Sequence, residues 1–281
     1  MNTAIVKPRL NAATVGGALV KRVPHIILTY WVIKIASTTL GETGADMFSM
    51  TYNLGYGLTI MIFLGLFLAL LGIKLWQKTY NATTYWLVFT ATAIVGTAIS
   101  DFIDRTLGLG YAAGSAILVS LLLLTLVAWY FKERSLSVEH IHTRSAEGFY
   151  WLAFLVANTL GTAAGDFMAD SLGLGFMQSA LIIGGVLVLI ALAHYFTKLP
   201  GILLFWLAFV LTRPFGATFG DLLTKTHEKG GLDLGTVGAS VFFAVMMALG
   251  LWWEAKREKT IPDDKAGVST TSYEENLDPL N

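Results

Sequence analysis

The stretch YWVIKIASTTLGETGAD, residues 30–46, decides the fold, because the same pattern occurs three more times in the chain. Its matches are YWLVFTATAIVGTAISD at 85–101, YWLAFLVANTLGTAAGD at 150–166 and FWLAFVLTRPFGATFGD at 205–221. In each copy a Trp follows an aromatic residue, and an Asp lies 15 residues after that Trp. A Gly lies five positions before the Asp, and a small residue directly precedes it. Self-similarity at a fixed spacing indicates a repeat architecture.

The composition is typical of a membrane protein. Of the 281 residues, 55% are hydrophobic and 14% are charged, and the mean hydropathy is +0.64. Soluble domains carry about a quarter charged residues. Nineteen Lys and Arg balance nineteen Asp and Glu, so the net charge says nothing about partners; we expect no nucleic-acid partner. The sequence has no cysteine, which excludes disulfides and thiolate metal sites.

Eight apolar segments have the length that a bilayer-spanning helix needs, about 20 residues. They lie near residues 25–45, 57–76, 84–101, 111–131, 149–166, 176–196, 201–220 and 235–253. Each copy of the pattern covers the first helix of a two-helix unit, and a Gly-rich connection leads to the second. We therefore predict an all-α integral membrane protein with eight transmembrane helices in four parallel two-helix repeats. Since every unit crosses twice, the repeats should be related by an axis near the membrane normal.

The predicted segments follow from the spacing of the copies. The Trp-to-Trp intervals are 55, 65 and 55 residues, so a polar linker separates two halves. We expect a cytoplasmic N-terminal segment (1–23), repeat 1 (24–80), repeat 2 (81–134), a cytoplasmic linker (135–148), repeat 3 (149–199), repeat 4 (200–255) and a disordered cytoplasmic tail (256–281).

The distribution of Lys and Arg predicts the orientation. The chain ends and the connections between units hold 14 of them, whereas the connections inside units hold three, Arg105, Lys225 and Lys229. Cytoplasmic loops carry the excess of Lys and Arg. Both termini should therefore be cytoplasmic, and the repeat Asp residues should lie toward the outer face of the membrane, facing the periplasm or the exterior.

The repeat Asp residues are the first candidates for a polar site. Intramembrane acids are costly and mark functional sites by default, although capping of the outer helix ends would explain them equally simply. The small residues of the motif favour close helix packing, which would turn the acids toward a shared axis. The predicted binding residues are Glu42, Asp46, Asp101, Asp166, Asp221, Thr97 and Thr162.

Two units break the repeat symmetry. Glu42 and Asp46 are four residues apart, on one helix face, and two like carboxylates there repel unless a cation or proton joins them. Lys34 is a predicted charge partner, with snorkelling to the cytoplasmic surface as the alternative. Arg213, directly before Pro214 in unit four, is a second charge partner, either of a site carboxylate or in a purely structural ion pair.

With this pattern the chain resembles a family of bacterial membrane proteins defined by a repeat of unknown function. Each repeat of that family has two spans and a characteristic Trp, here Trp31, Trp86, Trp151 and Trp206. The resemblance covers about residues 20–255 and implies the fold and a bacterial membrane location, without an activity. A looser similarity links residues 42–46, ETGAD, to the E-x-G-D motif of some divalent cation exporters, from which the extra Ala45 departs.

These observations favour a transporter of a small cation. A hard divalent ion such as manganese, exported by way of Glu42 and Asp46, is one version, because hard cations prefer oxygen ligands. A carrier or channel for a small organic solute is an alternative, as is a non-transporting scaffold or an intramembrane hydrolase with paired carboxylates. We expect no enzymatic activity and no cofactor in the leading interpretation, with the lipid bilayer as the partner.

Overall fold

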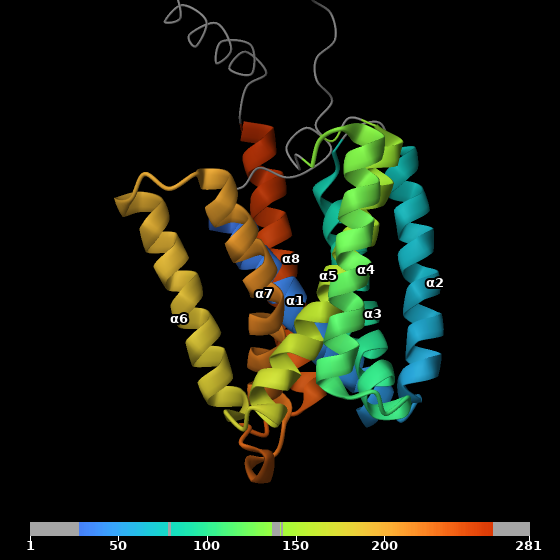
Figure 1. Ribbon diagram of the computed structural model, residues 1–281, viewed down its shortest axis with the longest axis vertical. Helices are drawn as coiled ribbons and strands as arrows, with labels where there is room; N and C mark the ends of the chain where they lie inside the picture. The colour runs from blue at the N-terminus through green and yellow to red at the C-terminus, as the bar shows by residue number, and fades with distance from the viewer. Residues whose placement is uncertain (1–27, 78–79, 137–140, 142, 261–281) are drawn as a thin grey trace, which may run out of the picture.

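The computed structural model describes residues 28–77, 80–136, 141 and 143–260, and all regular structure in this part of the chain is helical (Figure 1). The long helices are α1 (Leu28–Asp46), α2 (Gly55–Trp76), α3 (Ala82–Asp101), α4 (Gly110–Glu133), α5 (Arg144–Asp166), α6 (Gly175–Phe196), α7 (Gly201–Thr224) and α8 (Thr236–Thr260). Seven of these described helices are long and apolar enough to cross a membrane. The other is α1, which holds three charged residues, Lys34, Glu42 and Asp46. The predicted alternation of eight helices is confirmed.

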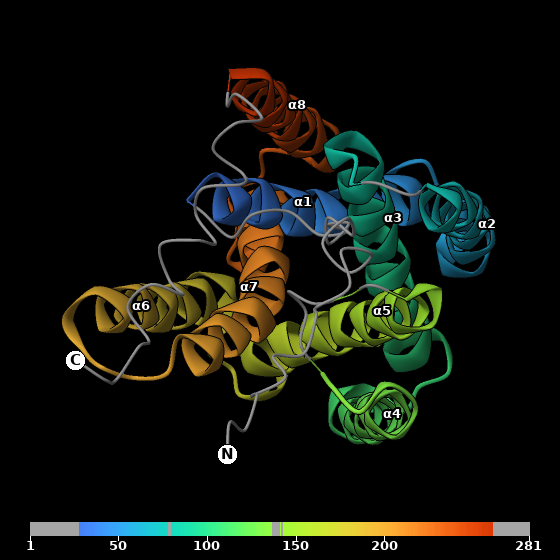
Figure 2. The same ribbon diagram turned by 90° about the horizontal axis from the view of Figure 1, so that it is seen from above.

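The four helices that carry the motif form a closed ring. Seen along the bundle, α1, α3, α5 and α7 surround a common centre, and α2, α4, α6 and α8 stand outside it (Figure 2). Each outer helix packs on the inner helix of the following repeat: α2 on α3, α4 on α5 and α6 on α7. The ring closes because α8 packs on α1. No repeat therefore packs as an isolated hairpin, and the four units depend on one another.

The motif glycines allow the inner helices to approach closely. Each Gly faces the next inner helix, and a Cβ added there would lie within 3.0 Å of that helix. Gly41 faces Ala93, Gly96 faces Asn158, Gly161 faces Arg213, and Gly216 faces Thr38. These four partners occupy the same repeat position, seven residues after the Trp. The predicted packing role of the small residues is confirmed.

Burial separates the two sets of helices. In the most apolar window of α3, α5 and α7, 78%, 61% and 50% of the residues are buried, whereas each of the four outer helices buries 22%. The outer helices expose large apolar side chains such as Leu66, Leu123, Leu189 and Leu249. Their high hydropathy thus faces outward, and the polar residues lie inside. This pattern suits a bundle surrounded by lipid.

At the motif Asp the inner helix widens into one turn of π-helix in repeats 1 to 3. These turns are Met47–Thr51, Phe102–Thr106 and Phe167–Ser171. Glycines with positive φ, which a residue without Cβ adopts easily, then begin the outer helices: Gly55, Gly110 and Gly175. In repeat 4, α7 continues past Asp221 to Thr224, and a short 3₁₀-helix (His227–Lys229) lies in the connection. We call this end of the bundle the Asp end and the opposite end the Trp end.

Two helices extend a few residues beyond the predicted repeat segments. Helix α5 begins at Arg144, inside the predicted linker, where Thr143 caps it by accepting a bond from Ala146 N. Helix α8 continues to Thr260, five residues into the predicted disordered tail. Helix α7 runs through Pro214 without ending there. The N-terminal segment 1–23 and residues 261–281 lie outside the described residues.

Candidate functional site

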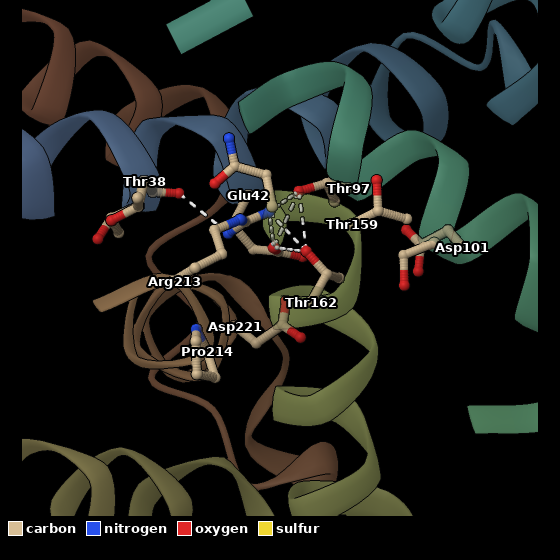
Figure 3. A network of polar contacts seen from close by, with 12 residues as sticks. Thr38, Glu42, Thr97, Asp101, Thr159, Thr162, Arg213, Pro214 and Asp221 are labelled. Carbon is tan, nitrogen blue, oxygen red and sulfur yellow. Dashed lines mark hydrogen bonds and ion pairs between the residues drawn. The ribbon is translucent and has the colours of Figure 1, made fainter. Parts of the chain in front are cut away.

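One polar layer lies where the four inner helices surround the axis. The residues directly after the motif glycines are Glu42, Thr97, Thr162 and Ala217, and all four are buried. The first three meet around a single acceptor (Figure 3). The Thr97 hydroxyl donates to Glu42 Oε2 at 3.1 Å and the Thr162 hydroxyl to the same atom at 3.4 Å. The structure thus brings together three of the predicted binding residues.

Arg213 supplies the counter-charge of this layer. Its Nη2 lies 3.3 Å from Glu42 Oε2 and also donates to the hydroxyls of Thr97 and Thr162, the latter at 2.5 Å. Its Nη1 donates to the Thr38 carbonyl oxygen at 3.3 Å. The Arg213 and Glu42 side chains are each 3% exposed. Arg213 thus forms an ion pair with Glu42, which fits both interpretations of this residue from the sequence, and both side chains are buried.

Arg213 fits in this position because the facing residue is a glycine. A Cβ on Gly161 would overlap Cβ and Cγ of Arg213, and Pro214 Cδ lies next to them. The carbonyl of Pro214 accepts from Thr218 Oγ1 at 2.9 Å, within the same helix. Gly161 on α5 therefore leaves the space that the Arg213 side chain on α7 occupies, and this close contact directs the guanidinium toward the axis.

The four motif Asp residues form a second layer at the Asp end, and they meet in two pairs. Lys225 Nζ lies 2.5 Å from Asp46 Oδ2 and 3.1 Å from Asp221 Oδ1. Arg105 Nε lies 3.3 Å from Asp101 Oδ1, and its Nη2 lies 3.7 Å from Asp166 Oδ2. Each cation joins the Asp of its own repeat to the Asp of the next one.

These two bridges alternate around the ring. One joins α7 to α1 and the other joins α3 to α5, so the fourfold repeat carries a twofold charge pattern. Burial alone would lower the pKa of Lys225, but the carboxylates of Asp221 and Asp46 outweigh it and raise that pKa. Lys225 therefore remains charged and holds two repeats together.

The two layers contain more acids than bases. Five buried carboxyl groups (Glu42, Asp46, Asp101, Asp166 and Asp221) face three basic groups (Arg105, Arg213 and Lys225), so the acidic groups outnumber the basic groups by two. Asp46 Oδ1 and Asp166 Oδ1 are buried and make no hydrogen bond in the described part of the chain.

Lys34 does not play its predicted part. Its side chain is buried, 1% exposed, so it does not snorkel to the surface. Its Nζ lies over aromatic rings, 3.6 Å from the Phe209 ring centre. Among the described residues the structure shows no ion pair between Lys34 and a carboxylate, and the partner of Glu42 is Arg213.

The predicted metal pair, Glu42 and Asp46, is divided between two cations. Glu42 contacts Arg213, and Asp46 contacts Lys225. Within the described ranges, no group of three or more His, Asp or Glu side chains is arranged to hold a metal ion. A metal bound here would have to displace Lys225 from Asp46 or enter between the two Asp pairs.

Sequence reasoning placed Arg105 and Lys225 in outer connections and missed their role in the site. The missed signal is their spacing, since each lies four residues after a motif Asp and shares its helix face. A second missed feature is a buried ion pair at the Trp end, in which Lys74 Nζ of α2 lies 3.3 Å from Glu147 Oε1 of α5. Nearby, the hydroxyls of Tyr85 and Tyr150 are 2.7 Å apart.

Four tandem two-helix units, closed into one ring around a polar axis, define an all-helical repeat protein. The chain belongs to the family of the Repeat of Unknown Function DUF347, which matches residues 29–80, 84–135, 149–199 and 204–260. The four-repeat family expected from the sequence is thereby confirmed. No curated protein and no solved structure matched the chain.

Proposed function

We propose that this protein spans a bacterial inner membrane and moves a cation along the axis of its inner ring. The apolar outer helices support insertion in a bilayer. The excess of Lys and Arg at the chain ends and between the units supports cytoplasmic termini. In this orientation the Asp end faces outward and the Trp end faces the cytoplasm.

The observation that carries the proposal is the shortage of positive charge in the polar axis. A carboxylate at membrane depth costs about 2.5–3.5 kcal/mol or more, and an uncompensated buried charge destabilises a protein by about 3–5 kcal/mol. With all five carboxyl groups ionised, two such charges would remain after the three bases are paired. Protons or a cation therefore neutralise the axis, and exchange between them is the chemistry of a cation carrier.

The oxygen donors in the axis suit several cations. Carboxylates and hydroxyls are the ligands that hard ions such as manganese prefer, so export of such an ion is one version of the proposal. Asp46 and Asp166 are the sites of first contact in this version, because these two motif carboxylates each have a buried oxygen with neither a hydrogen bond nor an ion pair. Entry of a cation would weaken the Lys225 and Arg105 bridges and so couple binding to movement between repeats.

A second function deserves testing because every motif Asp already contacts a base. Such a centre also suits a scaffold, in which the two bridges only lock the ring. The two functions differ in one observable outcome. A scaffold loses stability when the bridges are broken but carries no flux in any form.

The direct test is cation flux in vesicles that carry the purified protein. Manganese and proton movement should be measured for the native chain, for Asp46→Asn and Asp166→Asn, and for Asp170→Asn as a matched control. Asp170 lies in an exposed turn near the same end, and its carboxylate accepts from Tyr111 at 3.1 Å. We expect flux to fall at least tenfold in the first two variants only. Flux that is equal in all four proteins would refute the proposal, and absence of flux for every cation would favour the scaffold.

A further inference from the structure

An aromatic layer crosses the axis on the Trp side of the polar layers. The residues three positions after the motif tryptophans are Lys34, Phe89, Phe154 and Phe209. The phenylalanines are buried and contact one another in order around the ring. Phe89 and Phe154 have ring centres 5.0 Å apart, and Phe154 and Phe209 have centres 4.7 Å apart, both edge to face. Lys34 takes the fourth place of the layer.

The ammonium group of Lys34 lies among these three rings. Its Nζ is 3.6 Å from the Phe209 ring centre, 4.9 Å from that of Phe89 and 5.3 Å from that of Phe154. All three distances are within the roughly 6 Å range of cation–π attraction, which is worth about 2 kcal/mol or more when the cation is desolvated. The described part of the chain shows no carboxylate bonded to Lys34. Three aromatic rings thus surround the terminal nitrogen of this buried side chain.

We propose that Phe89, Phe154 and Phe209 form a binding site for a small organic ammonium ion, and that the Lys34 ammonium is its built-in occupant. Three aromatic faces around one point are the arrangement by which proteins recognise alkylated ammonium groups. A metal ion is a poor fit, because a hard cation would exchange oxygen ligands for rings. The chemistry of the rings favours an organic ammonium over a metal ion as the cation that this layer binds.

The position of the layer links this site to the acidic axis. Lys34 and Glu42 are eight residues apart on α1, about 12 Å along a helix, so a cation that passes the Phe layer meets Arg213 and Glu42 next. While the Lys34 side chain fills the layer, it occupies the place of any other cation. Withdrawal of Lys34 opens the site, and its return closes it. This mechanism rests on the proposed transport function, whereas binding at the Phe layer does not require transport.

The first test removes the occupant. Lys34→Ala, purified in detergent, should bind choline at least tenfold more tightly than its neutral isostere 3,3-dimethylbutan-1-ol, by calorimetry. The native chain should bind choline at least tenfold more weakly than this variant does. Adding Phe209→Ala should abolish the preference for the charged ligand, because the nearest ring is gone. Equal affinities for the two ligands, or no binding of either, would overturn the inference.

A second test uses the absence of cysteine from the chain, which makes Lys34→Cys a unique thiol. A cationic methanethiosulfonate, aminoethyl methanethiosulfonate, should modify this thiol at least tenfold faster than neutral methyl methanethiosulfonate, relative to their rates with free cysteine. A ratio of one or less would contradict an ammonium site, even if Lys34→Ala does not fold. Ammonium binding without flux would sustain this site and remove the transport proposal. Cation flux without ammonium binding would sustain the transport proposal and remove this site.

Discussion

Replacement of Arg213 by Met should be among the most damaging single changes in the molecule. It removes the base from a pair whose side chains are each 3% exposed, and it leaves Glu42 charged with only hydroxyl donors. Breaking one side of a buried ion pair costs about 3–5 kcal/mol. With a factor of ten for each 1.4 kcal/mol, the unfolding equilibrium constant should rise between about a hundredfold and several thousandfold.

The matched variant is Glu42→Thr/Arg213→Met, which removes both charges and places in repeat 1 the residue that repeats 2 and 3 carry. Replacing a whole buried ion pair is often close to neutral. The hydroxyls of Thr97 and Thr162 remain 3.4 Å apart and can bond each other. We expect the free energy of unfolding of the double variant to lie within about 2 kcal/mol of the native value, because each lost hydrogen bond costs about 1 kcal/mol.

The assay is reversible unfolding in mixed micelles, followed by tryptophan fluorescence for the native chain, both single variants and the double variant. A coupling free energy of at least about 2 kcal/mol between the two sites is expected for residues that contact each other. If the losses of the two single variants simply add in the double variant, Arg213 and Glu42 are energetically independent. That result would refute the reasoning on the polar layer.

Two further predictions concern the residues that hold this arrangement. Gly161→Ala should destabilise the protein by about 1–3 kcal/mol, as overpacking does, because the new Cβ overlaps the Arg213 side chain. The control Gly185→Ala, on α6 with open space around it, should be neutral or stabilise the protein by up to about 1 kcal/mol. Equal effects of the two substitutions in the same unfolding assay would argue against a steric role of Gly161. Lys225→Met should cost about 2–4 kcal/mol of stability, because two buried carboxylates lose their common base. The control Lys229→Met, at an exposed position, should change stability by less than about 0.5 kcal/mol. Thermal unfolding compares the two variants, and similar losses of stability would contradict the bridging role of Lys225.

The repeat allowed the number, length and order of the helices to be predicted. The constant interval between Trp and Asp, as in Trp31 and Asp46, marks the same helix four times, and the motif glycine indicates close packing. An axis that relates the repeats was predicted, but the packing of each outer helix on the following repeat was not, because nothing in the local pattern says that an outer helix leaves its own repeat. That arrangement depends on which apolar faces fit, as in the packing of α8 on α1.

The site was predicted in part. The break of symmetry at Glu42 and at Arg213 was visible in the aligned repeats, and the structure joins these two residues. The partner of Lys34 could not be found by a search for opposite charge, because its contacts are aromatic. Alignment of the repeats does place Lys34 at the same repeat position as three phenylalanines, so the aromatic contacts were indicated by this shared position and not by opposite charge.

The most direct measurement of the central claim is charge movement through the reconstituted protein on a solid-supported membrane. We predict that a jump in cation concentration drives a transient current with the sign of positive charge entering the protein. Asp46→Asn/Asp166→Asn should abolish this current, and Asp170→Asn should retain it. A protein that gives no current with manganese, protons or choline, or an equal current in all variants, would contradict a cation pathway along the acidic axis.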